Sequence, residues 1–600
     1  MINWEKEQQP YHMPLAEISG ALGLKRAAHL LRRATFGATK QQIDSFAALT
    51  PVQATTQLFG QALPAPVLPI DPKTGQEWVI TGTTDANSEG SDLNQYLLSW
   101  FVGQMMNPSL AYSAREKIIL FLHTHFTMIM EKVGDSRALY FQNALFRLFA
   151  LDSNATDPDV NFKKLTVKVS VDNAMLQLLD GTLNVKGSFN ENYARELLEL
   201  YSIGRGLEAN PPATSGEIGD YGVYREQDVQ TAARILTGWE YDEDFANIDP
   251  DTLLPRGRIK GSPTNASAHD NDATKPKQFS DRFTSTLFPG NTIVPDALLM
   301  AGGNATEESA LDEISKLIDL IYEQPETARN ICRKLYRFYL WAPHTSEEAL
   351  MVEGIVDQMV AFFVSPANNF RIQPVIENLL RSQHFYEAAG GVTDDGFGGL
   401  IKSPIDLVIG TLRFFNVQIP DLASQPEQYY EATGEILGHI VNQGMNFYNP
   451  YDVAGYEAYH QYPVYHRYWI TTNSLSKRYD FIRRLIDSQG TMTFNVNTYQ
   501  YIRDNFAAVA ADSEALLIAL ATYLLPHHDA LTFDDLADDT SSLTAPRLTY
   551  FKNRFLTDVS MNPEAYWTTT WNQGTDIGEL REWLNRLVGA LLQSPEYQLS

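Results

Sequence analysis

The chain has 600 residues, of which 44% are hydrophobic and 11% aromatic, so it can bury a large core. Its formal charge of −27 and its pI near 4.8 argue against nucleic-acid binding, which needs clusters of Lys and Arg to displace counterions from phosphates. The same charge disfavours binding to anionic membranes. The single cysteine, Cys332, excludes an intrachain disulfide and a multi-cysteine metal site. Because Cys332 lies in an apolar-periodic helix, we expect it to pack in the core.

The N-terminal stretch MINWEKEQQPYHMPLAE contains acidic residues and lacks the apolar segment of a signal peptide. We therefore expect a cytoplasmic protein, or an exported one if a leader was removed or another route is used. No run of the sequence approaches the ~18 apolar residues of a spanning helix, so we expect no membrane span.

Helical periodicity dominates the chain, because apolar residues recur at spacings of three and four. The predicted helices cover residues 23–34, 39–47, 51–60, 93–106, 111–130, 136–150, 171–179, 191–203, 225–238, 308–321, 325–341, 346–364, 371–382, 402–414, 428–443, 471–487, 498–508, 513–523, 545–557 and 577–593. Strand-like alternation is limited to weak candidates at 291–299 and 490–496. The sequence predicts a mostly α fold with long irregular insertions and at most short β-hairpins.

Irregular segments rich in Pro, Gly, Asp and Asn divide this helical pattern. We expect an N-terminal extension at 1–22 and a helical core at 23–387, with an irregular insertion at 240–306. A second helical part at 388–600 packs on the first and includes a Tyr-rich loop at 444–470. The glycine-rich run at 388–400 suggests the boundary, although one continuous helical body is equally compatible with the pattern.

The stretch SFNENYARELLELYSIGRG, which starts at Ser188, places several polar side chains on one face of a helix. At 100° per residue Asn192, Arg195, Glu196 and Glu199 form a stripe opposite the apolar face, and Asn190 or Asn192 can cap the helix. The two glutamates could raise one another's pKa or hold a cation. The alternative is a solvated face in which Arg195 pairs with Glu199 four residues on. The pattern alone favours the solvated face.

Two histidine motifs offer further chemistry. His123 and His125 lie two residues apart, so on a helix they point about 200° apart and cannot share one metal. A structural hydrogen bond is the commoner role of a single helical histidine. The pair His269-Asp270 has three interpretations: a catalytic dyad, a pair of ligands or a turn feature. Adjacent residues seldom have the orientation that a general base needs.

Familiar cofactor and nucleophile motifs are missing from the sequence. It contains no G-x-S-x-G elbow, P-loop, dinucleotide fingerprint or HExxH motif. We expect no nucleotide or flavin; a divalent metal of unknown identity remains an option.

The Tyr-rich segment FYNPYDVAGYEAYHQYPVYHRYW supplies candidate contact residues for a sugar or a protein partner. They are Tyr448, Tyr451, Tyr456, Tyr459 and Tyr462. The alternative is a loop that buried aromatic rings attach to the helical body.

A set of ordered motifs resembles the DUF1800 family, a bacterial family without an assigned function. The motifs are AAHLLRRATFGATKQQID (27–44), REKIILFLHTHF (115–126), LLDGTLNVKGSFNENYARELLELYSIG (178–204), YREQDVQTAARILTGW (224–239), the His269-Asp270 pair, ICRKLYRFYL (331–340), LLRSQHFY (379–386), GMNFYNPYDVAGY (444–456), WITTNSLSKR (469–478) and LVGALLQSPEYQ (587–598). The similarity spans about residues 25–600. It implies an all-α body and a shared polar constellation. Family members often carry export signals.

The chain also departs from the family pattern at three places. Arg225 stands where the family often has a capping Thr or Ser, and Tyr456 where it often has Trp. The lysine that usually follows the His-Asp pair corresponds to Lys275 or Lys277.

Two functional hypotheses follow. The favoured one is a soluble helical binding or assembly protein, with an acidic surface and a Tyr-rich loop that contacts a protein or glycan; the Asn/Arg/Glu set is then a buried network that fixes helix registry. Its oligomeric state is open.

The alternative is a hydrolase-like enzyme whose pocket, with or without a divalent metal, lies between helices. Its candidate catalytic residues are Glu196, His123, His125, His269 and Asp270. Residues that would orient the substrate or support these groups are Asn190, Asn192, Arg195, Glu199 and Trp239.

Overall fold

The structure is a computed structural model, and the residues that it describes are 15–82, 88–151, 160–272, 274–343, 345–386, 399–450, 454–456, 465–487, 490, 492–526, 531–534, 543–558 and 560–600. Within them the chain forms 24 α-helices and three short two-stranded sheets, which confirms the mostly α prediction.

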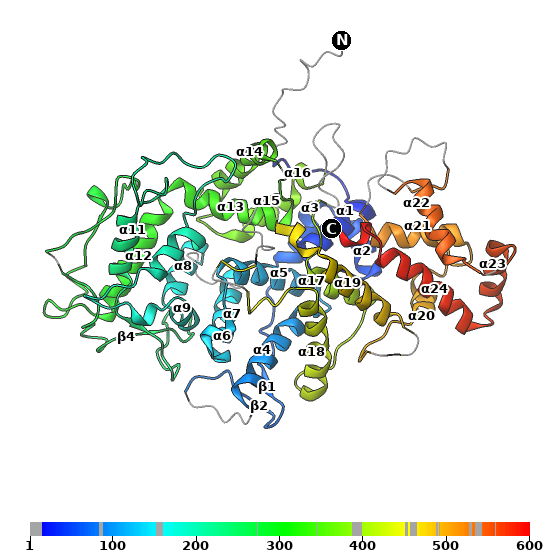
Figure 1. Ribbon diagram of the computed structural model, residues 1–600, viewed down its shortest axis with the longest axis horizontal. Coiled ribbons are helices and arrows are strands. Elements are labelled where there is room, and N and C mark those ends of the chain that lie inside the picture. Colours follow the sequence, from blue (N-terminus) through cyan, green and yellow to red (C-terminus); the bar gives the residue numbers. More distant parts are fainter. Residues whose placement is uncertain are drawn as a thin grey trace, which may run out of the picture.

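The helices follow one another along almost the whole chain (Figure 1). Their bounds are α1 Gly23–Ala34, α2 Lys40–Ala47, α3 Pro51–Phe59, α4 Gly90–Met105, α5 Leu110–His125, α6 Met130–Val133, α7 Ser136–Ala150, α8 Phe162–Ser170, α9 Asn173–Leu178, α10 Asn192–Glu196, α11 Glu226–Ile235, α12 Glu307–Tyr322, α13 Pro325–Tyr339, α14 Ser346–Phe363, α15 Ile372–Arg381, α16 Gln383–Tyr386, α17 Pro404–Phe414, α18 Pro426–Asn442, α19 Thr472–Leu485, α20 Thr498–Asn505, α21 Ser513–Leu524, α22 Ala545–Phe555, α23 Pro563–Gln573 and α24 Ile577–Leu592.

The described strands are two residues each and pair antiparallel. β1 (Ile70–Asp71) pairs with β2 (Gln76–Glu77), β3 (Trp239–Glu240) with β4 (Arg258–Ile259), and β5 (Lys277–Gln278) with β6 (Thr292–Ile293). The weak strand prediction at 291–299 therefore holds only for its first residues. The other candidate, 490–496, contains no strand among its described residues.

Side chains that accept hydrogen bonds from the first helical turn set the start of many helices. Thr39, Thr50, Ser109, Asp135, Asn161, Asp172, Thr306, Thr345, Ser403, Thr471, Asn497, Asp512 and Thr544 act in this way. Arg225 is the N-cap residue of α11, and its side chain makes no capping hydrogen bond. Instead, the side chain of Asp228 accepts a 2.7 Å hydrogen bond from the Arg225 N–H.

The predicted helix 111–130 ends early, at His125, and a separate turn, α6, follows. Phe126 leaves helical geometry, and the Met130 N–H donates to the Tyr448 carbonyl instead of continuing the helix. The periodicity argument also missed α8, α16 and α23. α8 is rich in β-branched residues, whose helix propensity is low, and burial of Phe162, Leu165 and Val169 holds it in place.

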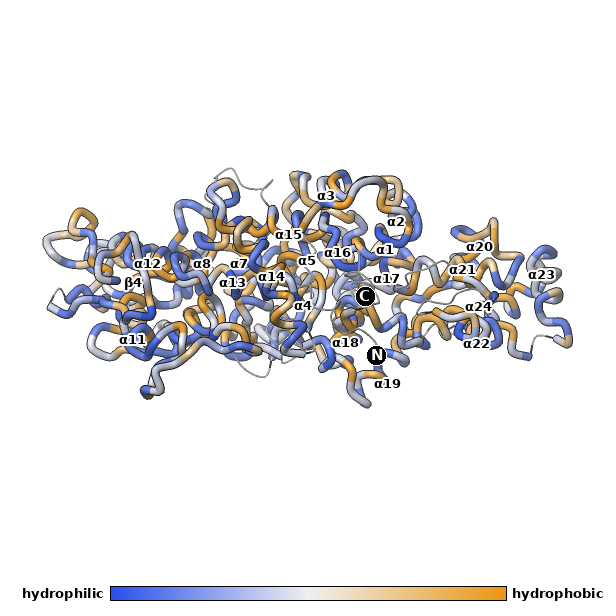
Figure 2. Tube along the Cα trace, turned by 90° about the horizontal axis from the view of Figure 1, so that it is seen from above, coloured by the Kyte–Doolittle hydropathy of each residue, from blue (hydrophilic) through white to orange (hydrophobic). Residues whose placement is uncertain are grey.

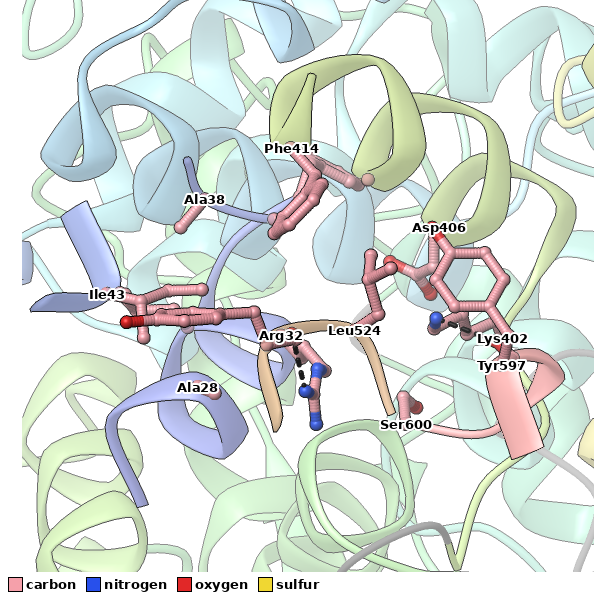
Figure 3. Close-up of a pocket in the computed structure, with 15 residues that line it drawn as sticks. Ala28, Arg32, Ala38, Ile43, Lys402, Asp406, Phe414, Leu524, Tyr597 and Ser600 are labelled. Carbon is pink, nitrogen blue, oxygen red and sulfur yellow. Dashed lines mark hydrogen bonds between the residues drawn. The ribbon is translucent and has the colours of Figure 1, made fainter. Parts of the chain in front are cut away.

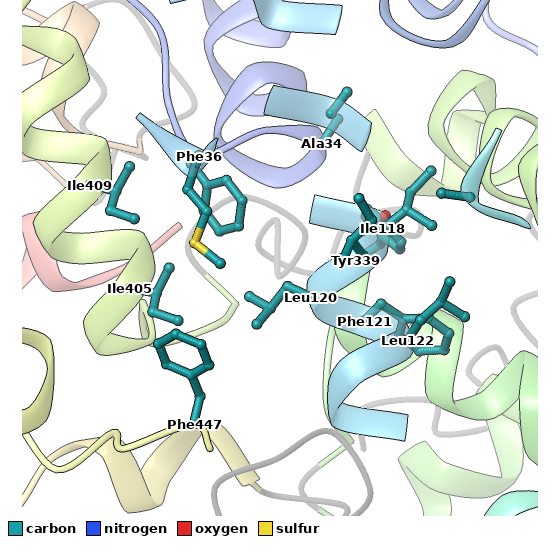
Figure 4. Close-up of a cluster of buried hydrophobic side chains, with 14 of the residues drawn as sticks. Ala34, Phe36, Ile118, Leu120, Phe121, Leu122, Tyr339, Ile405, Ile409 and Phe447 are labelled. Carbon is teal, nitrogen blue, oxygen red and sulfur yellow. The ribbon is translucent and has the colours of Figure 1, made fainter. Parts of the chain in front are cut away.

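One cluster of buried apolar side chains runs from Ile18 to Tyr597. Figure 4 shows part of it: Leu120 of α5 points toward Phe36 and Ile405, while Ile118 and Phe121 lie on the other side of α5, near Tyr339. Cys332 is fully buried, as predicted, and burial raises the pKa of its thiol.

The molecule is elongated. Figures 1 and 2 both place α11, α12 and β4 at one end and α20–α24 at the other. The last residues of the chain return to the middle, where Ser600 donates to the Leu400 carbonyl and Ile401 forms a bridge with Leu599. Among the described helices, none has the length and hydropathy needed to cross a membrane.

Candidate functional site

The helix that carries the motif NYARELLELY is built from two kinds of turn. α10 covers Asn192–Glu196, and a π-helical turn covers Leu197–Tyr201. A π turn shifts the backbone hydrogen bonds by one residue, so carbonyl groups at its end need other partners.

Three side chains from other elements satisfy these carbonyls. Lys334 of α13 donates to the Leu200 carbonyl at 2.5 Å, and Asn330 donates to the Ser202 carbonyl at 2.7 Å. His125 Nε2 lies 3.0 Å from the Tyr201 carbonyl oxygen, to which it donates. The HTHF motif and ICRKLYRFYL therefore meet the motif helix at its C-terminal end, where donors and positive charge are favourable.

The polar face of this helix forms ion pairs at the surface. Arg195 donates two hydrogen bonds, of 2.5 and 3.1 Å, to the Glu226 carboxylate, and Arg205 pairs with Glu199 at 2.6 Å. The interpretation that paired Arg195 with Glu199 was wrong, because each has a partner outside the helix. Glu196 is half-buried.

The asparagines before the helix organise its first turn. Asn190 Oδ1 accepts from the Asn192 N–H at 2.9 Å, and the Asn190 N–H donates to Asn184 Oδ1 at 3.1 Å. The Asn192 side chain is exposed and reaches the Leu179 carbonyl at 3.4 Å.

His123 packs away from His125, as the helical spacing predicted. Its Nε2 donates to the Phe447 carbonyl at 2.6 Å, and the Tyr448 ring lies 4.3 Å from the imidazole centre. Complete burial lowers the pKa of His123 to about 4, so the ring is neutral at physiological pH.

The His269-Asp270 pair lies where the irregular segment 240–306 packs on α11 and α12. His269 Nδ1 donates to the Thr237 carbonyl at 2.9 Å, and Nε2 faces the Glu313 carboxylate at 3.3 Å. Lys277 pairs with the same carboxylate. Burial opposes ionisation of Glu313, but His269 and Lys277 hold its pKa below the usual range.

The neighbouring Asp270 does not form a dyad with His269. Its carboxylate takes a 2.7 Å hydrogen bond from Arg234 Nε. Trp239, 1% exposed, is buried in the short sheet beside this junction. Gly238 has a φ of +90°, and an added Cβ there would lie 2.8 Å from the His269 nitrogen, so the GW pair permits close packing of the segment.

Of the tyrosines predicted to contact a partner, Tyr448 and Tyr456 are buried, at 2% and 7% exposure. The Tyr456 hydroxyl donates to the Asn449 carbonyl and accepts from the Asn446 N–H. For these two residues the surface prediction was wrong, because their rings attach the loop to the body. Tyr451, Tyr459 and Tyr462 lie outside the described residues.

The predicted catalytic residues are therefore held in separate hydrogen-bonding environments. None of them lines the cavities described below. Among the described residues, no three His, Cys, Asp or Glu side chains are grouped to hold a metal ion.

Two adjacent cavities in the middle of the molecule present a different set of residues. Arg32, Asp406 and Ser600 line both, Lys402 lines the first, and Arg33 and Lys117 line the second. Figure 3 shows Arg32 and Lys402 around the first cavity, with Tyr597 beside the lysine. We call this pair of cavities the basic cavities.

The ATFG turn builds one wall of the basic cavities. Gly37 has a φ of +100°, and a Cβ there would lie 2.9 Å from the Gly410 Cα on α17. The two glycines thus allow the turn after α1 to approach α17 closely, and Arg413 fixes the contact with a 2.8 Å hydrogen bond to the Gly37 carbonyl. This approach places Arg32 opposite Asp406.

The second wall comes from chain segments far apart in sequence. Lys402 donates to the Tyr597 carbonyl at 2.7 Å, with its amine 3.6 Å from the centre of the Tyr597 ring. Arg478 of α19, 0% exposed, locks this arrangement by donating to the Lys402 carbonyl at 2.8 Å and to Gln598 Oε1 at 3.2 Å.

Positively charged side chains outnumber negatively charged ones in the lining of the basic cavities. Lys117 pairs with Asp406, which is the single acidic side chain in the lining. Arg32 donates to the Tyr523 and Leu525 carbonyls, and Arg33 to the Ser600 backbone oxygen. Burial lowers the pKa of Arg32 and of Arg33 to about 10.

Lys402 is the most perturbed of these cations. Burial, followed by repulsion from Arg32, holds its pKa well below the usual range. Buried cations are costly unless an anion or a dense set of acceptors compensates them. The basic cavities are therefore suited to a negatively charged group.

Sequence reasoning missed these residues, although a signal was present. Arg33 comes just after the apolar pair Leu30-Leu31, and Lys117 comes just before the apolar run 118–122; fully buried Arg or Lys is rare unless it is paired. A cation at a core position of a helix is thus itself an indication of a buried anionic partner.

The fold and site define a mostly α protein with a cation-lined central cavity pair. The profile of one family, described as "Protein of unknown function (DUF1800)", matches residues 29–599, and the chain belongs to that family. No curated protein and no solved structure matches the chain.

Proposed function

We propose that this protein is a binding protein whose basic cavities hold a small oxyanion, such as a phosphate, a sulfate or the carboxylate of a larger ligand. The observation that carries the proposal is the convergence of four basic side chains, from three separate parts of the chain, on a lining with one acidic side chain. Even if a terminal carboxylate at Ser600 is counted as a second negative charge, the cations remain in excess.

The size of the cavities limits the ligand. Each has a volume of about 50 Å³, and a buried water needs about 10–15 Å³ on the same measure. Each cavity therefore has room for about four waters or one compact anion. A nucleotide or a sugar ring does not fit inside, although it could present an anionic group to the cavity.

The lining offers suitable donors. The Arg guanidinium presents a planar fork that matches carboxylate and phosphate oxygens, and the Lys402 ammonium adds a compact charge. An anion beside Lys402 favours its protonated form, so binding is coupled to proton uptake. Affinity should accordingly decrease as pH rises.

Calorimetric titration with phosphate, sulfate and acetate, at constant ionic strength in chloride, tests the proposal. We expect at least one of the three to bind and to raise the unfolding temperature. Sulfate, whose charge is constant above pH 4, is the anion for the pH series. If none of the three binds in preference to chloride, the proposal is refuted.

Two variants give opposite expected effects. Arg32→Gln removes a charge-assisted donor worth about 1.5–3 kcal/mol and should weaken binding at least tenfold. Asp406→Asn removes the acidic side chain and should strengthen binding.

Arg381→Gln is the matched control: Arg381 is also partly buried and hydrogen-bonded, to Thr55 and Glu377, but lies outside the cavities. Equal weakening by Arg381→Gln would contradict the assignment.

The hydrolase alternative keeps less support, because its candidate residues face no common cavity among those described.

A further inference from the structure

We infer that a groove between α19, α22 and α24 binds an acidic polysaccharide chain. This groove, which we call the arginine groove, is separate in its residues from the basic cavities. Its volume of about 790 Å³ is within the range of small-ligand sites, and it is open to solvent, as a polymer site must be.

Each of the three helices contributes one face. Arg547, Tyr550 and Arg554 follow a spacing of three and four on α22, so they share one side of that helix. Tyr479 and Arg483 line the groove from α19 in the same way. Figure 1 shows α22 and α24 together at the α20–α24 end of the molecule.

The floor is formed by α24, where small residues keep the space open. Gly589 and Ala590 line the groove, and a Cβ on Gly589 would already lie 3.3 Å from the Ile486 side chain. Asn585 and Gln593, on the same stripe of α24, add amide groups that can bond to hydroxyls.

The charge of the lining is opposite to that of the whole chain. Four arginines and two acidic residues, Asp487 and Glu582, line the groove; with Glu596, which pairs with Arg547 from just outside the lining, the arginines still outnumber the acidic groups, on a protein with a net charge of −27. The arginines are Arg483, Arg547, Arg554 and Arg586.

The arginines at the rim are available to a ligand. The side chain of Arg554 is exposed and forms no hydrogen bond or ion pair with the described residues. The side chain of Arg483 is 69% exposed and, among the described residues, pairs only with Asp480, three residues earlier on its own helix. A surface ion pair of this kind stabilises a protein by about 0–1 kcal/mol, so a ligand carboxylate can replace Asp480 as the partner of Arg483.

The kind of polyanion follows from the rest of the lining. Tyr550, 48% exposed, has the Arg547 guanidinium 4.9 Å from its ring centre and supplies its edge or its other face for a sugar, while the amides and guanidinium forks bind hydroxyls and carboxylates. Arg483 of α19 and Arg554 of α22 present exposed guanidinium groups from two helices, which suits carboxylates repeated along an extended chain, whereas Arg547 is held by Glu596 at 2.7 and 2.9 Å. Deep apolar holes for peptide side chains are not part of this lining, so a uronic-acid polysaccharide fits better than an acidic peptide.

Biolayer interferometry on the full-length protein tests this inference with three polymers: alginate, neutral dextran and poly-glutamate. We expect alginate to bind with an affinity that falls as salt increases, dextran not to bind, and poly-glutamate to bind at least tenfold more weakly than alginate. Arg554→Glu and Arg483→Glu should each weaken alginate binding at least tenfold. Poly-glutamate binding as tight as alginate would overturn the choice of ligand.

The matched control is Arg503→Glu, an equal charge change at an exposed arginine of α20 that does not line the groove. It should leave alginate binding unchanged; an equal loss would show general charge attraction and refute the site. Circular dichroism confirms the fold of each variant. Arg32→Gln should also leave alginate binding unchanged, so the fate of this inference is separable from that of the oxyanion proposal.

Discussion

Asp172 is expected to make the stability of the protein fall as pH rises toward neutrality. It is 4% exposed at the start of α9, where its carboxylate accepts 3.0 Å hydrogen bonds from the Met175 N–H and from Gln142. Burial outweighs these bonds and raises its pKa from 3.8 to about 7. Between these two values the folded protein keeps a proton that the unfolded chain releases, so the free energy of unfolding decreases with pH across that window.

The magnitude follows from the shift. About three pKa units at 1.36 kcal/mol each set a limit of about 4 kcal/mol at pH 8. Asp172→Asn retains an acceptor for the cap and for Gln142 but carries no charge at any pH. The variant should differ from the wild type by no more than about 1 kcal/mol near pH 4.5 and become more stable by up to about 4 kcal/mol at pH 8.

Urea unfolding followed by circular dichroism between pH 4.5 and 8 measures this difference. The control is Asp281→Asn, because the Asp281 side chain is 78% exposed and makes one surface pair with Arg225; its stability difference from wild type should stay within about 1 kcal/mol throughout. A difference for Asp172→Asn that is constant with pH, or a loss of stability at pH 8, would refute the reasoning.

Two further substitutions test the junctions around the motif helix and the irregular segment. Lys334→Met should lower the free energy of unfolding by about 1–3 kcal/mol, because the Leu200 carbonyl loses its donor. Burial lowers the pKa of Lys334 to about 7, so at pH 6 the wild-type protein must bury a charged amine and at pH 9 a neutral one. The loss of stability in the variant should therefore be smaller at pH 6 than at pH 9. Urea titrations at both pH values check this, and a larger cost at pH 6 would contradict it. Glu313→Gln should cost about 3–5 kcal/mol, because it leaves Lys277 buried without a carboxylate; limited proteolysis of segment 240–306 should speed up, and unchanged cleavage would argue against its role in holding the segment.

Much of the fold was predictable because helix periodicity and capping are local. The helix predicted at 513–523 appears as α21, and the start of α12 is set by Thr306, whose hydroxyl is a local signal. The π turn at Leu197–Tyr201 was not predictable in the same way. It depends on Lys334, Asn330 and His125, which reach it from distant parts of the chain.

The candidate site was harder to predict than the fold. Polar residues in the motif helix drew attention because they are unusual in sequence, yet Arg195 pairs with Glu226 and Glu199 with Arg205 at the surface. Lys402 carries no local pattern at all. Its importance comes from burial beside Arg32, and that proximity exists only in three dimensions.

The position of the last residues has a consequence for how the chain folds. Arg33 and the Ser600 backbone oxygen that it contacts are 567 residues apart, and Lys402 reaches the Tyr597 carbonyl across 195 residues. Contacts of such long range require large loops to close before they contribute to stability. During synthesis α1 therefore emerges long before these neighbours exist, and the central cavities cannot close until the segment 597–600 has been made.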